Sequence, residues 1–357
     1  MDAVSQRLER FSAERAAEVA DLGAEAADFI ASGVAAVHGG KRLRARFLYA
    51  GWRAVAEAAG RSAVVPEAVV AAACAVEVFH AAALVHDDLI DNSDTRRGRP
   101  AAHRALQSRH DAAGWRGDAA AFGRSAAILL GDLLLGWSDD LFEEGLAASP
   151  EAPSAGARAV YARMRRDVTL GQFLDVAEES AWATEPDDRH AERALRVARL
   201  KSARYSVQQP LLVGAALAGA DDDQNAALAA FGEPLGLAFQ LRDDVLGVFG
   251  DAVVTGKPTG DDLREGKRTV LIALTREELP PGGRRTVDEL LGDAGLDAGQ
   301  IEMLQRTIVD TGALQRVEAM IAGYVREADR ALSGTRLGNA AVGELRDLGR
   351  AATARSA

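Results

Sequence analysis

The chain has 357 residues, 48% of them hydrophobic and 27% charged, which excludes a mainly disordered or collagen-like protein. Its 42 Lys and Arg against 53 Asp and Glu give a net charge of −11, which argues against nucleic acid and anionic membranes as partners. Cys74 is the only cysteine, which excludes a disulfide framework and a cysteine-based zinc cluster and favours a reducing, cytoplasmic compartment.

The predicted elements are helices, because alanine is abundant, aromatic residues make up only 5% and alternating strand patterns are nearly absent. The breaks between them are too short for an interdomain linker. We therefore predict a single all-α domain over residues 1–357. Its predicted helices run near residues 3–37, 42–59, 66–91, 119–147, 155–182, 189–219, 224–249, 268–278, 285–292, 297–332 and 339–354.

The longest apolar run covers residues 68–85 and is interrupted by Glu77 and His80. Its composition favours a buried helix, so we expect no membrane span. Residues 1–11 are charged and lack the apolar core of a signal peptide.

An aspartate-rich segment ends the helix predicted over residues 66–91. Asp87 and Asp91 lie four residues apart on one helix face, with Asp88 beside them. Their charges repel one another and oppose the negative end of the helix dipole, so we expect a cation there. Mg²⁺ prefers oxygen ligands and is usually held by one or two carboxylates together with substrate phosphates. A basic tail follows the aspartates, in which Arg96 and Arg97 precede Gly98.

A second aspartate pair, Asp243 and Asp244, lies near the end of the helix predicted over residues 224–249. A glycine-rich segment follows at residues 256–267 and carries Lys257 and Lys267, a combination typical of phosphate binding. A single pair of this kind would indicate only a solvated helix end. Two pairs that each end an apolar helix and precede basic residues favour a metal and phosphate site.

A basic cluster at residues 39–46 begins the helix predicted over residues 42–59. Its cations oppose the positive end of the helix dipole, whereas a bound anion would suit both the dipole and the side chains.

In these motifs the chain resembles the trans-isoprenyl diphosphate synthases, the polyprenyl synthetases that include farnesyl and geranylgeranyl diphosphate synthases. The resemblance extends from Gly39 to about Lys267 and is greatest to a geranylgeranyl diphosphate synthase. It implies an isoprenoid synthase fold, a bundle of about ten or more helices around a central cavity, and a homodimer. The segments that carry it are Asp87–Gly98, Phe239–Asp244, Gly131–Leu134, Gly171–Asp175 and Lys201–Ser202.

The resemblance implies an Mg²⁺-dependent, head-to-tail condensation of isopentenyl diphosphate with dimethylallyl, geranyl or farnesyl diphosphate, which releases inorganic diphosphate. It implies about three Mg²⁺ ions with substrate bound, where metal and cations stabilise the leaving diphosphate. The implied metal ligands are Asp87, Asp88, Asp91 and Asp243, and these four with Asp244 and Lys201 form the catalytic set. The residues implied to hold the allylic diphosphate are Arg96, Lys201, Ser202, Gln240, Lys257 and Lys267. Those implied to hold isopentenyl diphosphate are Lys41, Arg44, His80 and Arg97.

The chain departs from the family pattern at three positions. Ala45 stands where a proline is usual, Ser202 where a threonine is usual, and Gly247 where some members have a third aspartate. The serine keeps the hydroxyl, and Asp243 and Asp244 remain as the second metal arm.

Product length follows from the residues that precede Asp87, because the growing chain should run down that helix. Ala83 and Ala82 lie four and five positions before Asp87 and leave the upper pocket open, which disfavours a stop at the fifteen-carbon product. Phe79 lies about two turns below Asp87, where its ring either floors the pocket or packs in the core. We expect geranylgeranyl diphosphate or a somewhat longer product.

Two alternatives remain. A class I terpene cyclase also begins with metal-assisted ionisation of a diphosphate, but Lys41, Arg44 and the Phe239–Asp244 segment count against it. A catalytically silent regulatory subunit of a prenyl synthase is disfavoured by the intact aspartates and lysines.

Overall fold

The computed structural model of the protein describes residues 1–61, 64–96, 98–147, 149–251 and 259–353. Within these residues the regular structure is helical apart from one short antiparallel hairpin, in which β1 (Thr95–Arg96) pairs with β2 (Arg99–Pro100). The predicted all-α fold class is therefore confirmed. In chain order the other elements are α1 (Asp2–Glu18), α2 (Ala24–Val37), α3 (Leu43–Ala58), α4 (Glu67–Ile90), α5 (Ala102–Ala112), α6 (Ala119–Leu146), α7 (Glu151–Ala181), η1 (Asp187–Arg189), α8 (His190–Val197), η2 (Ala198–Gln208), α9 (Gln209–Leu217), α10 (Asp222–Phe249), α12 (Asp261–Arg264), α13 (Val270–Glu278), α14 (Pro281–Leu290), α15 (Ala298–Asp310), α16 (Ala313–Ala331) and α17 (Asn339–Thr353).

The structure divides three of the predicted helices. The helix predicted over residues 3–37 breaks between α1 and α2, where Gly23 has a φ of 95°. The helix predicted over residues 297–332 breaks at Gly312, which adopts the left-handed conformation before α16. Residues 189–219 form α8, the π-helix η2 and α9 in succession. Helix α5 was not predicted, because its 11 residues bury only three side chains and show no clear apolar period.

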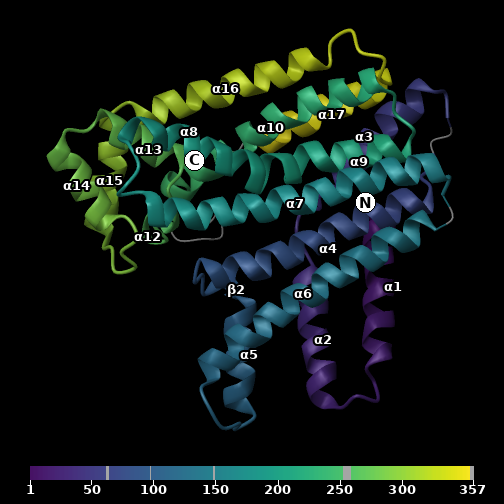
Figure 1. Cartoon of the computed structure of the whole chain (residues 1–357), viewed down its shortest axis with the longest axis horizontal. Coiled ribbons are helices and arrows are strands. Elements are labelled where there is room, and N and C mark those ends of the chain that lie inside the picture. The colour runs from purple at the N-terminus through teal and green to yellow at the C-terminus, as the bar shows by residue number, and fades with distance from the viewer. Residues whose placement is uncertain (62–63, 97, 148, 252–258, 354–357) are drawn as a thin grey trace.

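The long helices lie alongside one another along the long axis of the molecule (Figure 1). Helix α4 packs along α6, α3 packs on α9, and α10 packs on η2 and α16. Helices α1, α2 and α5 project on one side of this body, and α13, α14 and α15 gather at one end of it.

The core is divided into two large hydrophobic clusters. One spans α3, α4, α6 and α9 and includes the alanine-rich middle of α4, where Ala72, Ala75 and Ala82 are 0% exposed. The other joins α10 to α13, α15 and α16. Small side chains let α4 and α6 approach closely, which fixes the position of the aspartates at the end of α4.

Two helices are long and apolar enough to cross a membrane by length and composition, α4 and α6. In α4 the most apolar window is 83% buried inside the protein, as expected for residues 68–85. In α6 the corresponding window is only 28% buried, so this helix leaves an apolar face uncovered within the described chain.

Candidate active site

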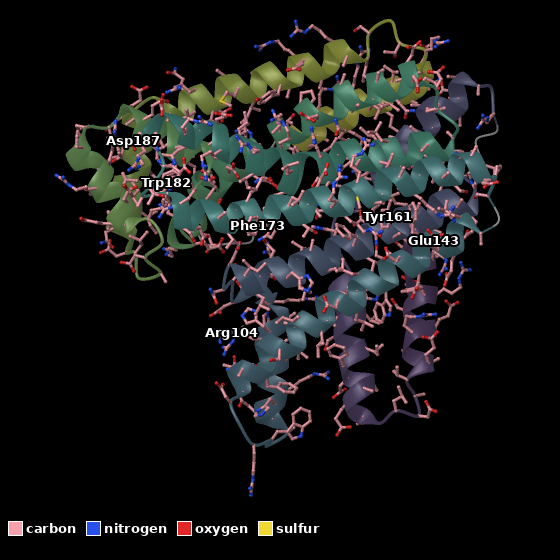
Figure 2. All side chains as sticks on the ribbon, in the orientation of Figure 1. Arg104, Glu143, Tyr161, Phe173, Trp182 and Asp187 are labelled. Carbon is pink, nitrogen blue, oxygen red and sulfur yellow. The ribbon has the colours of Figure 1, made fainter. Side chains whose placement is uncertain are left out.

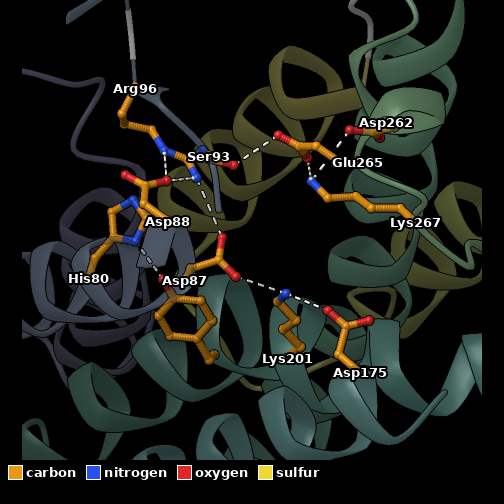
Figure 3. Close-up of polar contacts among 11 residues, drawn as sticks. His80, Asp87, Asp88, Ser93, Arg96, Asp175, Lys201, Asp262, Glu265 and Lys267 are labelled. Carbon is orange, nitrogen blue, oxygen red and sulfur yellow. Dashed lines mark hydrogen bonds and ion pairs between the residues drawn. The ribbon is translucent and has the colours of Figure 1, made fainter. Parts of the chain in front are cut away.

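The carboxylates at the end of α4 are held by cations from two other elements (Figure 3). Arg96 of β1 donates through Nε to Oδ1 of Asp88 at 2.7 Å, and its Nη2 lies 3.5 Å from Oδ2 of Asp87. Lys201 places Nζ 2.9 Å from Oδ1 of Asp87 and 2.5 Å from Oδ2 of Asp175. Asp88 is only 3% exposed, so Arg96 rather than water compensates its charge. Four predicted site residues therefore meet here.

Lys201 and Ser202 lie in the π-helix η2, a rare geometry that is frequent at functional sites. A Cβ atom at Gly171 of α7 would lie 2.3 Å from the backbone nitrogen of Lys201, so a glycine is required for this approach of α7 to η2. The segment 171–175 thus has two physical roles. Gly171 admits η2, and Asp175 pairs with the lysine that η2 carries.

The carboxylates of α4 differ in how well their charge is compensated. Burial and the charge of Asp87 raise the pKa of Asp91 to about 6. Burial also opposes ionisation of Asp87, but Lys201, Lys267 and Arg96 outweigh it and hold its pKa below the ordinary value. Burial disfavours the charge of Lys201 as well, yet the neighbouring aspartates outweigh it and raise its pKa. Asp87 and Lys201 therefore stay ionised, and the charge of Asp91 is less well compensated than that of Asp87.

The second aspartate pair lies on α10. Asp243 is half-buried, whereas Asp244 is 7% exposed and accepts a hydrogen bond from Nε2 of Gln240 at 2.7 Å. Burial and the charge of Asp262 raise the pKa of Asp244 to about 8, so its protonated form is favoured at neutral pH. Asp243 is therefore the stronger candidate for a metal ligand on this arm, and its role as a ligand stays a prediction.

Gly247, where some family members have a third aspartate, makes room for a carboxylate from α12. A Cβ atom at this glycine would lie 1.9 Å from Oδ2 of Asp262. Asp262 itself is buried and lies 3.4 Å from Nζ of Lys267. The position of a third α10 aspartate is thus taken by Asp262.

A hydrogen bond between Ser93 and Glu265 joins the aspartate-rich end of α4 to α12, the short helix that follows α10. The hydroxyl of Ser93, just beyond α4, donates to Oε1 of Glu265 at 2.9 Å. Glu265 follows α12, and its Oε2 lies 2.7 Å from Nζ of Lys267. Lys267, one of the cations predicted to hold the allylic diphosphate, is thereby fixed opposite Asp87 and Lys201 (Figure 3).

Two residues predicted to bind isopentenyl diphosphate meet on Tyr205. The guanidinium of Arg44 lies 4.2 Å from the centre of the Tyr205 ring and donates to Oγ of Ser206 at 2.8 Å. Nδ1 of His80 lies 2.5 Å from the Tyr205 hydroxyl. Burial raises the pKa of Tyr205 to about 12, so its hydroxyl keeps its proton. Lys41 is exposed at the start of the same turn as Arg44.

The predicted chain-length residues lie below the aspartates on α4. Ala82 is 0% exposed, whereas Ala83 is half-buried. Phe79 is 4% exposed, and its ring lies edge-on to the rings of Tyr161 and Tyr205, with centroids 6.5 and 6.0 Å away. Phe79 thus belongs to a packed aromatic layer, and its role as a pocket floor stays a prediction.

The oxygen donors of the site suit Mg²⁺ as a metal ion that the protein shares with the substrate diphosphate. Among the described residues, no group of three or more His, Cys, Asp or Glu side chains forms a ready-made metal site. Each arm instead offers one or two carboxylates, Asp87 and Asp91 from α4 and Asp243 from α10. This partial set fits Mg²⁺, which usually completes its shell with water and substrate phosphates.

Two predicted site residues, Arg97 and Lys257, lie outside the described residues. Others in contact with the site were not predicted as site residues. The segment 171–175 contained a signal for Asp175, and the glycine-rich segment contained one for Asp262 and Glu265. Tyr205 had none, because an aromatic residue in an apolar helix is usually core. These additional residues are Ser93, Asp175, Tyr205, Ser206, Asp262 and Glu265.

Comparison with known proteins gives one consistent result. The model of the polyprenyl synthetase family matches residues 31–308. The chain is 30% identical over 296 residues to geranylfarnesyl diphosphate synthase of Aeropyrum pernix, which covers 83% of each protein. It is 33% identical over 258 residues to (2E,6E)-farnesyl diphosphate synthase of Mycobacterium tuberculosis, which covers 72% of this chain and 62% of that relative.

A solved structure of geranylgeranyl pyrophosphate synthase from Corynebacterium glutamicum, complexed with isoprenyl diphosphate and magnesium, is similar over nearly its whole length. Its TM-score is 0.92 at 37% sequence identity, and the match covers 99% of this chain and 98% of that chain. A polyprenyl synthase from Caulobacter crescentus, complexed with calcium and isoprenyl diphosphate, has a TM-score of 0.76 at 27% identity, covering 100% and 96%.

Proposed function

The chain belongs to the polyprenyl synthetase family and is a trans-prenyl diphosphate synthase, and we propose that it uses Mg²⁺ to make geranylgeranyl diphosphate or a longer product. The observation that carries this proposal is the position of Lys201. Its ammonium lies 2.9 Å from Asp87 and 2.5 Å from Asp175, so it joins the aspartate-rich end of α4 to α7.

The cations of the site act on the allylic diphosphate. As the allylic C–O bond breaks, its electron pair leaves with the diphosphate, and negative charge gathers on the diphosphate oxygens. Lys201, Arg96 and Lys267 are held in place by carboxylates, so they stabilise this charge without rearranging first. Mg²⁺ bound by Asp87, Asp91 and Asp243 would add Lewis-acid stabilisation of the same diphosphate.

The second substrate is held on the other side of the site. Arg44 and Lys41 bind the diphosphate group of isopentenyl diphosphate. His80 lies on the same side of the site, because it contacts Tyr205, the ring on which Arg44 stacks. The isopentenyl double bond attacks the allylic carbon, a new C–C bond forms, and a proton leaves to the departing diphosphate. This proton transfer needs no side-chain base.

The product has at least twenty carbons in this proposal. Ala83, half-buried one turn below Asp87, has no side chain large enough to stop the growing chain, and Phe79 with Tyr161 would close its path about two turns below Asp87. The names of the relatives include geranylgeranyl and geranylfarnesyl diphosphate synthases, whose named products lie in this range, as well as a farnesyl diphosphate synthase, whose named product is shorter.

We also propose that the enzyme is a cytoplasmic homodimer. Helices α6 and α7 leave large apolar side chains on the surface, and Phe173 of α7 is 66% exposed (Figure 2). We infer that a second copy of the chain covers these apolar faces. The single free cysteine, which is buried, supports a reducing, cytoplasmic compartment. The exposed apolar residues of these two helices are Ile128, Leu129, Leu170, Phe173 and Val176.

Product analysis tests the proposal. Purified protein is incubated with Mg²⁺, isopentenyl diphosphate and one of dimethylallyl, geranyl or farnesyl diphosphate, and the products are separated by chain length. We expect a product of twenty carbons or more, and none when Mg²⁺ is chelated. A cyclic hydrocarbon formed from an allylic diphosphate alone would identify a terpene cyclase, and no turnover with any primer would identify a silent subunit.

A further inference from the structure

The first turn of α3 is capped by a side chain from another helix. Arg42, at the start of α3, adopts the left-handed conformation with a φ of 50° and its side chain caps no backbone N–H. The N–H of Ala45, the third residue of the helix, instead donates to Oε1 of Glu77 on α4 at 2.9 Å. The first N–H groups of a helix have no partner within it, so a carboxylate at this place satisfies one of them and suits the helix dipole.

Glu77 also connects the loop before α3 to α4. It is 6% exposed, and its Oε2 lies 3.9 Å from Nη1 of Arg42. The same Nη1 donates to the carbonyl of Val37 at 2.9 Å, so Arg42 lies between the last residue of α2 and the buried carboxylate of Glu77. A buried carboxylate is tolerated only when it is paired and hydrogen-bonded, and these contacts meet that condition.

The Ala45 bond is possible because this chain lacks the proline that is usual in the family at that position. A proline has no N–H to donate, and it holds the first turn of a helix by its fixed φ. In this chain the hydrogen bond to Glu77 holds the same turn. Glu77 lies three residues before His80 on α4, so a single helix sets the relative positions of His80 and the α3 turn.

We propose that Glu77 is a positioning residue that aligns Lys41 and Arg44 for isopentenyl diphosphate by capping α3 from α4. The proposal rests on the proposed function, since it assigns Glu77 to the isopentenyl side of that site. Glu77 does not contact the reacting atoms, and its effect is on how well the α3 turn holds its substrate.

The first test compares the two substrates. Glu77→Ala should raise the KM for isopentenyl diphosphate about tenfold or more, the scale of a lost hydrogen bond to a charged group, while the KM for farnesyl diphosphate changes less than about threefold. Glu77→Gln keeps an acceptor oxygen and the side-chain shape and should give a smaller increase with the same selectivity. An equal rise for both substrates in either folded variant would overturn the proposal.

Glu57, near the opposite end of α3, offers a matched control. Its carboxylate accepts the N–H groups of Ala340 and Ala341 in the first turn of α17, at 2.9 and 3.1 Å, so it caps a helix from another helix as Glu77 does. Glu57→Ala should lower the melting temperature and leave both KM values unchanged. If Glu57→Ala raised the isopentenyl KM as much as Glu77→Ala, loss of a helix cap in general would explain the effect, and the proposal would be wrong.

A double-mutant cycle with Ala45→Pro tests the mechanism. In the Ala45→Pro background there is no N–H for Glu77 to accept, so Glu77→Ala should raise the isopentenyl KM by no more than about threefold. The same large effect in both backgrounds would show that the Ala45 bond is not involved. Failure of the wild-type enzyme to transfer prenyl groups would contradict the proposed function, whereas an active wild type with a Glu77→Ala variant of unchanged KM values would contradict only this proposal.

Discussion

The ammonium of Lys201 lies 2.9 Å from Oδ1 of Asp87, and this contact connects the π-helix η2 to the aspartate-rich end of α4. One group is predicted to hold diphosphate and the other to hold metal. Each keeps the other ionised, since the lysine lowers the pKa of Asp87 and the aspartates raise the pKa of Lys201. The diphosphate therefore meets a lysine that is charged and already in position.

Lys201→Met should reduce turnover by about a hundredfold or more, because it removes a charge aimed at the departing diphosphate. The same change should raise the pKa of Asp87 towards its ordinary value or above, because burial is then less compensated. Steady-state turnover and far-ultraviolet circular dichroism together check this. A folded variant with near-native turnover would remove Lys201 from the site.

Lys41→Ala should raise the KM for isopentenyl diphosphate more than the KM for the allylic primer. Lys41 is exposed and precedes Arg44 at the start of α3, on the side of the site assigned to isopentenyl diphosphate. Initial rates at varied concentrations of each substrate provide the measurement. Equal effects on the two KM values would mean that the basic cluster acts through general electrostatics.

Ala83→Phe should shorten the product towards fifteen carbons, because it places a large side chain one turn below Asp87. Ala83 is the better position for this test than Ala82, since Ala82 is 0% exposed and a ring there would overpack the core at a cost of about 1–3 kcal/mol. Chromatography of the dephosphorylated products reads the outcome. An unchanged distribution from a folded Ala83→Phe enzyme would place the growing chain on another path.

Phe79→Ala is the complementary change and should lengthen the product by at least one five-carbon unit. The ring packs against Tyr161 and Tyr205, so its loss should also cost about 3–5 kcal/mol of stability. Product analysis must therefore be done below the lowered melting temperature. If the folded variant makes the wild-type product, Phe79 only packs in the core and another helix forms the floor.

His190 should make stability fall as the pH is lowered. Its ring is 1% exposed, stacks on Trp182 at a centroid distance of 3.9 Å, and has no hydrogen-bond partner on either nitrogen among the described residues. Burial, with Arg276 nearby, lowers the pKa of His190, so the folded protein binds fewer protons than the unfolded chain. The resulting stability is complete above the ordinary histidine pKa of about 6.5 and is lost as the pH falls below it.

Thermal unfolding at pH 7.5 and 5.5 measures this effect. His190→Phe keeps the stack on Trp182 but cannot be protonated, so its melting temperature should fall less than that of the wild type between the two pH values. An identical fall in both proteins would show that other groups cause the pH dependence.

The sequence alone predicted the ends of α4 and α10 and the residue types there, because helical spacing and charge are local properties. The partners of those residues could not be predicted in the same way. Ser93 and Glu265 meet only because α12 folds back against the end of α4. Tyr205 joins Arg44 to His80 across three helical elements, and nothing in its local pattern distinguishes it from a core aromatic residue.

The breaks in the predicted helices have similar origins. A glycine such as Gly312 is tolerated inside a helix or ends it, and long-range packing decides between the two outcomes. The π-helical turn of η2 cannot be seen in the helical period of the sequence, since it becomes evident only where Gly171 lets α7 approach Lys201.

The most direct test of the two-arm site is turnover of Asp87→Asn and Asp243→Asn at saturating Mg²⁺ and saturating substrates. Each change keeps the side-chain size and removes one negative charge, so the helical fold should persist while turnover falls by orders of magnitude in both variants. Circular dichroism confirms the fold, and released inorganic diphosphate reports turnover. Near-native turnover of either folded variant would contradict the assignment of that arm to Mg²⁺ and the diphosphate.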